Sequence, residues 1–130
     1  MEREYENINL IKLQSYSDRE LCELFVYTDK IKNADYKSKC MFVMCIMEIN
    51  RRNNTEPPDI INVIGIANIY KRNGSTIFQG GKEYEIYCVD NYLLIYDDDM
   101  LPCLFSKDQN NELYVWKFFV INNNKITYTS

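Results

Sequence analysis

Residues 80–105, GGKEYEIYCVDNYLLIYDDDMLPCLF, decide the fold class that the sequence predicts. The stretch contains short runs rich in β-branched and aromatic residues, separated by an Asp-Asn turn at 90–91 and by an acidic triplet at 97–99. Short runs of this composition, bounded by Gly, Asn and Asp, are typical of strands joined by tight turns. The stretch therefore predicts consecutive antiparallel strands.

Further strand patterns lie on both sides of this stretch. Residues 60–70 predict one long strand in which Gly65 marks a bulge or a close backbone approach. Residues 113–121, LYVWKFFVI, have the most strand-like composition of the chain, and residues 125–128 predict a last strand. Short strands at this spacing favour a small closed or half-closed antiparallel barrel over a parallel sheet.

The N-terminal part of the chain predicts two helices. Ser17 and Glu20 form a capping box, and residues 17–33 then carry apolar side chains at three-and-four spacing. Asp35 predicts the N-cap of a second helix that ends near residue 52. Two helices joined this tightly form an αα-hairpin.

The second predicted helix contains an unusually apolar segment. Residues 40–47, CMFVMCIM, are apolar on all sides of a helix, so they predict either the buried centre of the fold or a face that binds a partner. Met fills irregular gaps in cores and also lines adaptable binding grooves, which leaves both alternatives open. Before the hairpin, the apolar residues at 8–13 predict a short strand or an ordered arm.

A break in composition separates the helices from the strands. Residues 53–59, NNTEPPD, contain consecutive prolines, which remove backbone donors and disfavour helix just before them. The predicted organisation is a single α+β unit over residues 1–130, with the αα-hairpin at 17–52 packed on a small antiparallel barrel at 60–130.

Composition and charge argue against several function classes. The 130-residue chain has a formal net charge of −4, and Lys and Arg do not cluster without acidic neighbours, so the pattern of a nucleic-acid binder is missing. A basic or neutral protein partner suits such a chain better. No apolar run approaches the ~20 residues of a membrane span and no signal peptide is recognisable, so we expect a cytoplasmic protein.

The sequence offers little for catalysis or metal binding. It contains no His, so the usual base of a hydrolase triad or a Cys-His dyad is missing. The five Cys residues are odd in number and form no Cys-x-x-Cys pair, which predicts buried free thiols in place of disulfides or a zinc site. We therefore expect no catalytic residues, no metal and no cofactor.

The acidic triplet and several aromatic residues are the candidate binding residues. Consecutive carboxylates in a turn point in different directions, which predicts a solvated tip or a protein-contact patch and argues against a preformed metal site. Aromatic residues at alternating strand positions cannot all point inward, so some either anchor a partner or are covered by the helical hairpin. The predicted partner-binding residues are Asp97, Asp98, Asp99, Tyr92, Tyr96 and Trp116.

Residues 70–121 resemble the small SH3-like barrel proteins of bacteria and their phages. The resemblance rests on the strand entry GKEYEI at 81–86, the strand LIYDD at 94–98 and the late segment FFVI at 118–121. The helical region is similar to hairpins of small Gram-positive and phage proteins. The chain departs from such proteins at residues 101–105, LPCLF, where they often have a Tyr-Leu-Tyr-Pro-Pro stretch. The resemblance therefore implies an SH3-like barrel and no shared ligand.

Small size, acidic charge, the missing catalytic groups and the phage-like resemblance lead to one functional prediction. We expect a non-enzymatic inhibitor, encoded by a phage or a mobile element, that binds and blocks a bacterial defence effector in the manner of an anti-CRISPR protein. The alternatives are an immunity protein that neutralises a cognate basic toxin, and a barrel that binds nucleotides or nucleic acid. Self-association through the Met-rich helix is also left open.

Overall fold

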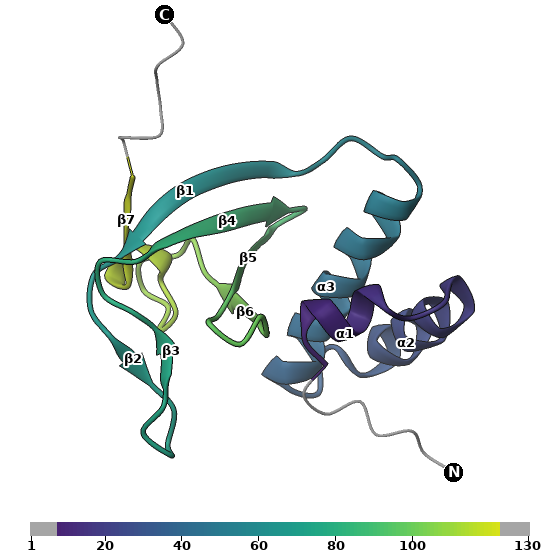
Figure 1. The fold of residues 1–130 in the computed structure, drawn as a ribbon, viewed down its shortest axis with the longest axis horizontal. Helices are drawn as coiled ribbons and strands as arrows, with labels where there is room; N and C mark the ends of the chain where they lie inside the picture. Colours follow the sequence, from purple (N-terminus) through teal and green to yellow (C-terminus); the bar gives the residue numbers. More distant parts are fainter. Residues whose placement is uncertain (1–7, 123–130) are drawn as a thin grey trace, which may run out of the picture.

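The helices and the sheet occupy opposite ends of the molecule (Figure 1). The computed structural model describes residues 8–122, and the predicted strand at 125–128 lies outside these residues. The α-helices α1 (Leu10–Gln14), α2 (Asp18–Ile31) and α3 (Tyr36–Arg52) precede the strands along the chain. The predicted α+β class is confirmed.

Five strands form one antiparallel sheet, and two more form a separate hairpin. The strands are β1 (Asp59–Gly65), β2 (Ile69–Tyr70), β3 (Thr76–Phe78), β4 (Glu83–Val89), β5 (Tyr92–Tyr96), β6 (Pro102–Phe105) and β7 (Phe119–Ile121). The sheet order is β6-β5-β4-β1-β7, so the first and the last of these strands pair with each other. After β1 the chain leaves the sheet, forms the β2–β3 hairpin and re-enters the sheet at β4.

The beginning of the described chain is helical, so the predicted strand at 8–13 is wrong. The Asn9 side chain accepts a hydrogen bond from the Lys12 amide at 2.9 Å and caps α1. Ile8 and Leu13 are fully buried in the cluster that the helices share with the sheet. Their burial confirms the alternative prediction of an ordered arm that packs on the rest of the chain.

The capping residues of α2 and α3 explain where these helices begin. The Ser17 hydroxyl accepts from the Glu20 amide at 3.1 Å and the Ser17 amide donates to the Glu20 carboxylate at 2.9 Å, which confirms the capping box. The Asp35 carboxylate accepts from the Ser38 amide at 2.7 Å, and this hydrogen bond lowers the pKa of Asp35. Both helices therefore begin where the sequence predicts.

The sheet carries a hydrophobic cluster on each face. On the helix side, Met44 of α3 lies in one cluster with Leu94, Tyr96 and Leu104. The cluster on the opposite face consists of Val63, Phe78, Tyr84, Ile86, Leu93, Ile95, Val115 and Phe119. The Met-rich segment at 40–47 belongs to the helix-side cluster, so the alternative that it forms part of the core is confirmed.

β1 ends at Gly65, so the predicted single strand over residues 60–70 is wrong in its second half. A Cβ at position 65 would lie 2.4 Å from the Gln79 carbonyl oxygen, which leaves room only for glycine. The Gly65 amide donates to the Lys82 carbonyl at 3.0 Å, and the Gly65 carbonyl accepts from the Gly81 amide at 2.8 Å. The predicted close backbone approach is thus confirmed, and the chain leaves the sheet at this point.

Most of the predicted strand at 113–121 is a turn. Val115–Lys117 form the 3-10 helix η1, and β7 contains only the last part of the segment. The Val115 amide donates to the Ser106 carbonyl at 2.9 Å, and the Val115 side chain is buried in the cluster that contains Phe119. The segment has to connect β6 at one edge of the sheet with β7 at the other edge, so its apolar side chains pack while the backbone turns.

The cysteines are all free thiols, as the sequence predicts. Cys40 and Cys45 are buried in α3, and Cys88 and Cys103 are half-buried in the sheet. Cys22 is exposed on α2, so the prediction of burial is wrong for this residue because it lies outside the apolar face of the helix.

A buried carboxylate links the three α-helices. Glu48 of α3 is 3% exposed, and its oxygens accept from Arg51 at 2.7 and 2.9 Å and from Arg52 at 2.8 Å. Arg52 also donates to the Asp18 carboxylate of α2 and to the Tyr16 carbonyl, which follows α1, at 2.8 Å each. The hydrogen bonds from Arg51, and then those from Arg52, hold the pKa of Glu48 below its usual value.

Replacement of Arg52 by Met is expected to destabilise the fold by about 2 kcal/mol, because Glu48 keeps only one cationic partner and the contacts to α1 and α2 are lost. Urea denaturation followed by circular dichroism measures the free energy of unfolding. Arg19→Met is the control, because Arg19 forms an exposed pair with Glu23 and such pairs contribute little. Equal destabilisation by the two substitutions would contradict this role of Arg52.

Candidate functional site

The acidic triplet is folded into the protein, and its carboxylates bind other parts of the chain. Asp97 is buried, and its carboxylate accepts from the amides of Asp99 at 2.8 Å and Leu101 at 2.9 Å. Burial raises the pKa of Asp97. Asp99 pairs with Lys71, which lies in the turn between β2 and β3. The prediction of a solvated tip is therefore wrong for Asp97, whose carboxylate caps the backbone of the turn.

Asp98 is held by side chains that precede it in the sequence. It accepts from Lys82 Nζ at 2.7 Å, from the Tyr84 hydroxyl at 2.8 Å and from the Gln79 side-chain amide at 3.0 Å. Burial raises the pKa of Asp98, but these hydrogen bonds outweigh burial and hold the pKa below its usual value. The triplet thus connects the β5–β6 turn to the start of β4 through hydrogen bonds. Lys71 and Lys82 balance much of the negative charge of the three aspartates.

The predicted aromatic residues lie in two different places. Tyr96 is buried and Tyr92 is half-buried in the helix-side cluster. Trp116 is half-buried against the cluster on the opposite face of the sheet. The structure therefore does not bring the acidic triplet, Tyr92, Tyr96 and Trp116 together in one site.

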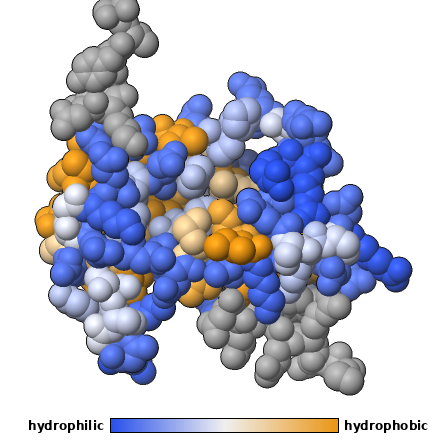
Figure 2. All heavy atoms as spheres, in the orientation of Figure 1, coloured by the Kyte–Doolittle hydropathy of each residue, from blue (hydrophilic) through white to orange (hydrophobic). Residues whose placement is uncertain are grey.

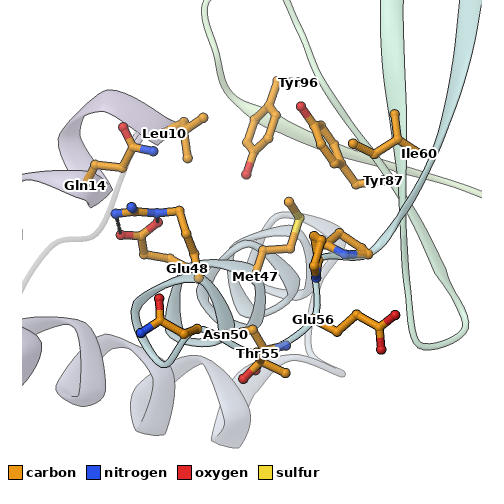
Figure 3. Close-up of a pocket in the computed structure, with 14 residues that line it drawn as sticks. Leu10, Gln14, Met47, Glu48, Asn50, Thr55, Glu56, Ile60, Tyr87 and Tyr96 are labelled. Carbon is orange, nitrogen blue, oxygen red and sulfur yellow. Dashed lines mark hydrogen bonds and ion pairs between the residues drawn. The ribbon is translucent and has the colours of Figure 1, made fainter.

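A pocket lies between α3 and the sheet, and we call it the seam pocket (Figure 3). Its volume is about 510 Å³, which is within the range of small-molecule sites. The apolar part of its lining consists of Leu10, Met47, Pro57, Pro58, Ile60, Tyr87 and Tyr96. These residues come from α1, α3, the connection after α3 and the strands β1, β4 and β5, so the pocket exists only where all these segments meet.

The Tyr96 side chain enters the seam pocket from β5, and its hydroxyl points toward Glu48 and Met47 (Figure 3). Tyr96 is 8% exposed, and within residues 8–122 its hydroxyl is buried without a hydrogen-bond partner. Burial, together with the nearby Tyr87, Glu48 and Cys45, raises the pKa of Tyr96, so the hydroxyl is protonated at neutral pH. An unsatisfied buried donor is unfavourable, which makes this hydroxyl the most notable polar group of the pocket.

Glu48 forms the charged side of the seam pocket, but its charge is neutralised. Its Oε1 accepts from Arg51 Nε, and its Oε2 accepts from Arg51 Nη2 and from Arg52 Nε. Figure 3 marks the interaction between Glu48 and the guanidinium group that lines the pocket beside it. The pocket therefore combines apolar walls, a balanced ion pair and one unsatisfied hydroxyl.

A second candidate surface runs along the outer face of β1 toward β7. We call Ile60, Ile64, Ile66 and Val120 the outer strip; Ile60 also lines the seam pocket, and Val120 lies opposite Ile64 in the β1–β7 register. The exposed fractions are 45% for Ile60, 51% for Ile66 and 49% for Val120. Figure 2 shows hydrophobic residues gathered along β1 and at the β7 end of the sheet, whereas the helical end is mostly hydrophilic.

Glutamates border the outer strip. Glu83 and Glu85 of β4 lie opposite Ile64 and Asn62 in the β1–β4 register, so their side chains project from the same face as the strip. Glu85 is exposed, and Glu83 accepts from the Asn122 side-chain amide at 3.0 Å. An apolar surface with an acidic border is complementary to a basic protein surface.

Comparisons with known proteins do not indicate a function for this chain. Protein families, curated proteins and solved structures contain no match to this chain. Over residues 8–122, no group of three or more His, Cys, Asp or Glu is placed to hold a metal ion. No helix in the described part of the chain is long and apolar enough to cross a membrane.

The sequence contained a signal for the outer strip but none for the seam pocket. Ile60, Ile64 and Ile66 are separated by even numbers of positions in the strand predicted at 60–70, which places them on one face. The sequence does not indicate that this face stays uncovered, because that depends on where the helices pack. Met47 and Tyr87 lie in separate segments, and no local pattern indicates that they line one cavity.

Asp98→Asn is expected to reduce the loss of stability at acid pH. Because the pKa of Asp98 is lower in the folded protein, its carboxylate stabilises the fold above about pH 4, and this contribution is lost as the pH falls through the folded pKa. The free energy of unfolding of the wild type should therefore decrease more between about pH 7 and pH 3 than that of the variant. Urea denaturation at both pH values measures the difference.

Asp97→Asn is the matched control, because it should change the loss of stability on acidification in the opposite direction. The pKa of Asp97 is higher in the folded protein, so its protonation favours the wild-type fold as the pH falls. The variant lacks this contribution and should lose more stability than the wild type on acidification. Parallel pH profiles for the three proteins would contradict both assignments.

Proposed function

We propose that this protein is a non-enzymatic inhibitor that binds a basic protein partner through the outer strip. The observation that carries the proposal is the exposed apolar surface of Ile60, Ile66 and Val120 beside Glu83 and Glu85. Exposed apolar residues within a polar rim are typical of protein-binding surfaces. The net charge of −4 adds long-range attraction toward a basic partner.

Within this proposal, the sheet is an SH3-like barrel that presents the outer strip. An SH3-like barrel has its first strand between the second and the last, and β1 lies between β4 and β7. The β2–β3 hairpin is inserted between β1 and β4, and η1 directly precedes β7, both of which support the assignment. In this arrangement the strip lies on the outside of the barrel, because the cluster on the opposite face fills the inside.

We propose that the partner is a bacterial defence effector and that a phage or a mobile element encodes the inhibitor. Effectors that act on nucleic acid carry basic surfaces for the phosphate backbone, and an acidic protein surface can occupy them. The absence of His from the sequence fits a mechanism by binding alone, and the free thiols fit action in the cytoplasm. An immunity protein that neutralises a basic toxin would use the same surface, so the identity of the partner distinguishes the two.

Affinity capture from nuclease-treated lysates of bacteria that carry defence systems, followed by mass spectrometry, identifies the partner. We expect one stoichiometric protein with a basic surface. With that partner purified, Ile66→Ser and the double variant Glu83→Lys/Glu85→Lys should each weaken binding about tenfold in calorimetric titrations. Val26→Ser is the control, because Val26 is also an exposed apolar residue but lies on α2.

Two results would contradict the proposal. If the outer-strip variants bind the purified partner as tightly as the wild type, the outer strip is not the docking surface. If the partner keeps its full activity when saturated with this protein, the protein is not its inhibitor. Loss of every partner after nuclease treatment would instead favour a nucleic-acid-binding barrel, which Glu83 and Glu85 disfavour because they repel phosphate.

A further inference from the structure

The seam pocket leads to an inference that is independent of the protein-binding proposal. We propose that the seam pocket binds a small, uncharged, largely apolar molecule that accepts a hydrogen bond from the Tyr96 hydroxyl through a carbonyl oxygen. Three features of the pocket define this molecule. Its volume and apolar walls define the size and polarity, the unsatisfied Tyr96 hydroxyl defines the polar group, and the surrounding charges define the net charge.

The size and walls of the pocket define an apolar ligand. A volume of about 510 Å³ lies within the range of small-molecule sites, so the pocket can hold a small ligand. Leu10 and Met47 face Ile60 and Tyr87 across this space, so a ligand between them is contacted from the helices and from the sheet (Figure 3). Met is the apolar side chain that adapts most easily to the shape of a ligand.

The Tyr96 hydroxyl defines the polar group of the ligand. The Tyr96 ring packs edge-on against Tyr87, with 5.9 Å between the ring centroids, which holds the hydroxyl inside the pocket. Both oxygens of the adjacent Glu48 already accept hydrogen bonds from Arg51 and Arg52. The protonated hydroxyl is therefore a buried donor without an acceptor in the described chain. A ligand oxygen satisfies it once a flexible neighbouring side chain of the pocket, Met47, shifts to admit the ligand.

The charges around the pocket define an uncharged ligand. Glu48 and Glu56 line the pocket and disfavour a carboxylate or a phosphate. Arg51 lies on the same side as Glu48 and disfavours a cation. Because Glu48 and the arginines neutralise each other, this cluster offers no uncompensated charge for an ion to pair with. The exposed Glu56 adds a negative charge to the lining, which disfavours an anion.

Acetophenone and ethylbenzene are suitable probes, because they have nearly the same size and differ in the carbonyl oxygen. The methyl signal of Met47, assigned with Met47→Leu in protein with ¹³C-labelled methionine methyls, reports binding from inside the pocket. We expect acetophenone to bind about tenfold more tightly than ethylbenzene, as one hydrogen bond to a neutral group predicts. In Tyr96→Phe, which keeps the ring, the preference for acetophenone should be lost or reversed, because its carbonyl would be buried without a donor.

Tyr92→Phe is the matched control, because Tyr92 is a half-buried tyrosine of the same strand and does not line the seam pocket. It should keep the preference for acetophenone. Equal affinities of the two probes in the wild type, an unchanged preference in Tyr96→Phe, or a Met47 signal that does not respond to acetophenone would overturn the proposal. Benzoate that binds as tightly as acetophenone would overturn the assignment of an uncharged ligand.

Tyr96 lies outside the outer strip, so the two proposals can fail separately. Capture of the protein partner by Tyr96→Phe reports on the outer strip alone, and probe binding by Ile66→Ser reports on the seam pocket alone. Ile60 belongs to both surfaces and is therefore unsuitable for either test.

Discussion

The burial of β5 on both faces is the constraint on which the rest of the structure depends. Leu93 and Ile95 lie in the cluster on one face, while Leu94 and Tyr96 lie in the helix-side cluster. A buried aliphatic side chain contributes about 1.5–3 kcal/mol relative to an exposed one, so the helices are needed to cover the second pair. The Met-rich segment at 40–47 suits this position, because flexible side chains fill the space between a helix and a twisted sheet.

The two candidate surfaces lie where this helical cover ends. α3 packs on β5 and β6, while Ile60 of β1 and Ile66, which directly follows β1, remain exposed. The connection after α3 spans from the helix to the sheet (Figure 1). Residues 54–58 of this connection line the seam pocket. A compact layer of helices over a wider sheet therefore produces both a partly open pocket and an exposed apolar strip.

Ionic interactions within the chain determine which charges are available to a partner. Asp97 caps backbone amides, Asp98 is bound by Lys82, and Glu48 is bound by two arginines. These carboxylates stabilise turns and helix contacts, and they contribute little to an acidic docking surface. The exposed Glu85 beside the outer strip is better placed to attract a basic partner than the run of three aspartates.

Interactions between near neighbours could be predicted from the sequence. The capping box at Ser17 and the Asp90 turn, where φ is 52°, depend on residues a few positions apart, and so does the meander of β4, β5 and β6. The α+β class follows from these elements and from the apolar pattern of the helices. The same reasoning failed for η1, because an apolar run is compatible with a strand and with a turn that crosses the end of a sheet.

The functional surfaces were decided only by the tertiary structure. The sequence identified Tyr96 as a candidate binding residue, but as an interface anchor near an acidic patch, whereas the structure buries it with its hydroxyl in the seam pocket. The exposure of Ile60 and the neutralisation of Glu48 likewise depend on segments that are distant in sequence. Local patterns determine which elements form, but burial and hydrogen-bond satisfaction arise from contacts between elements, and only the packed chain decides them.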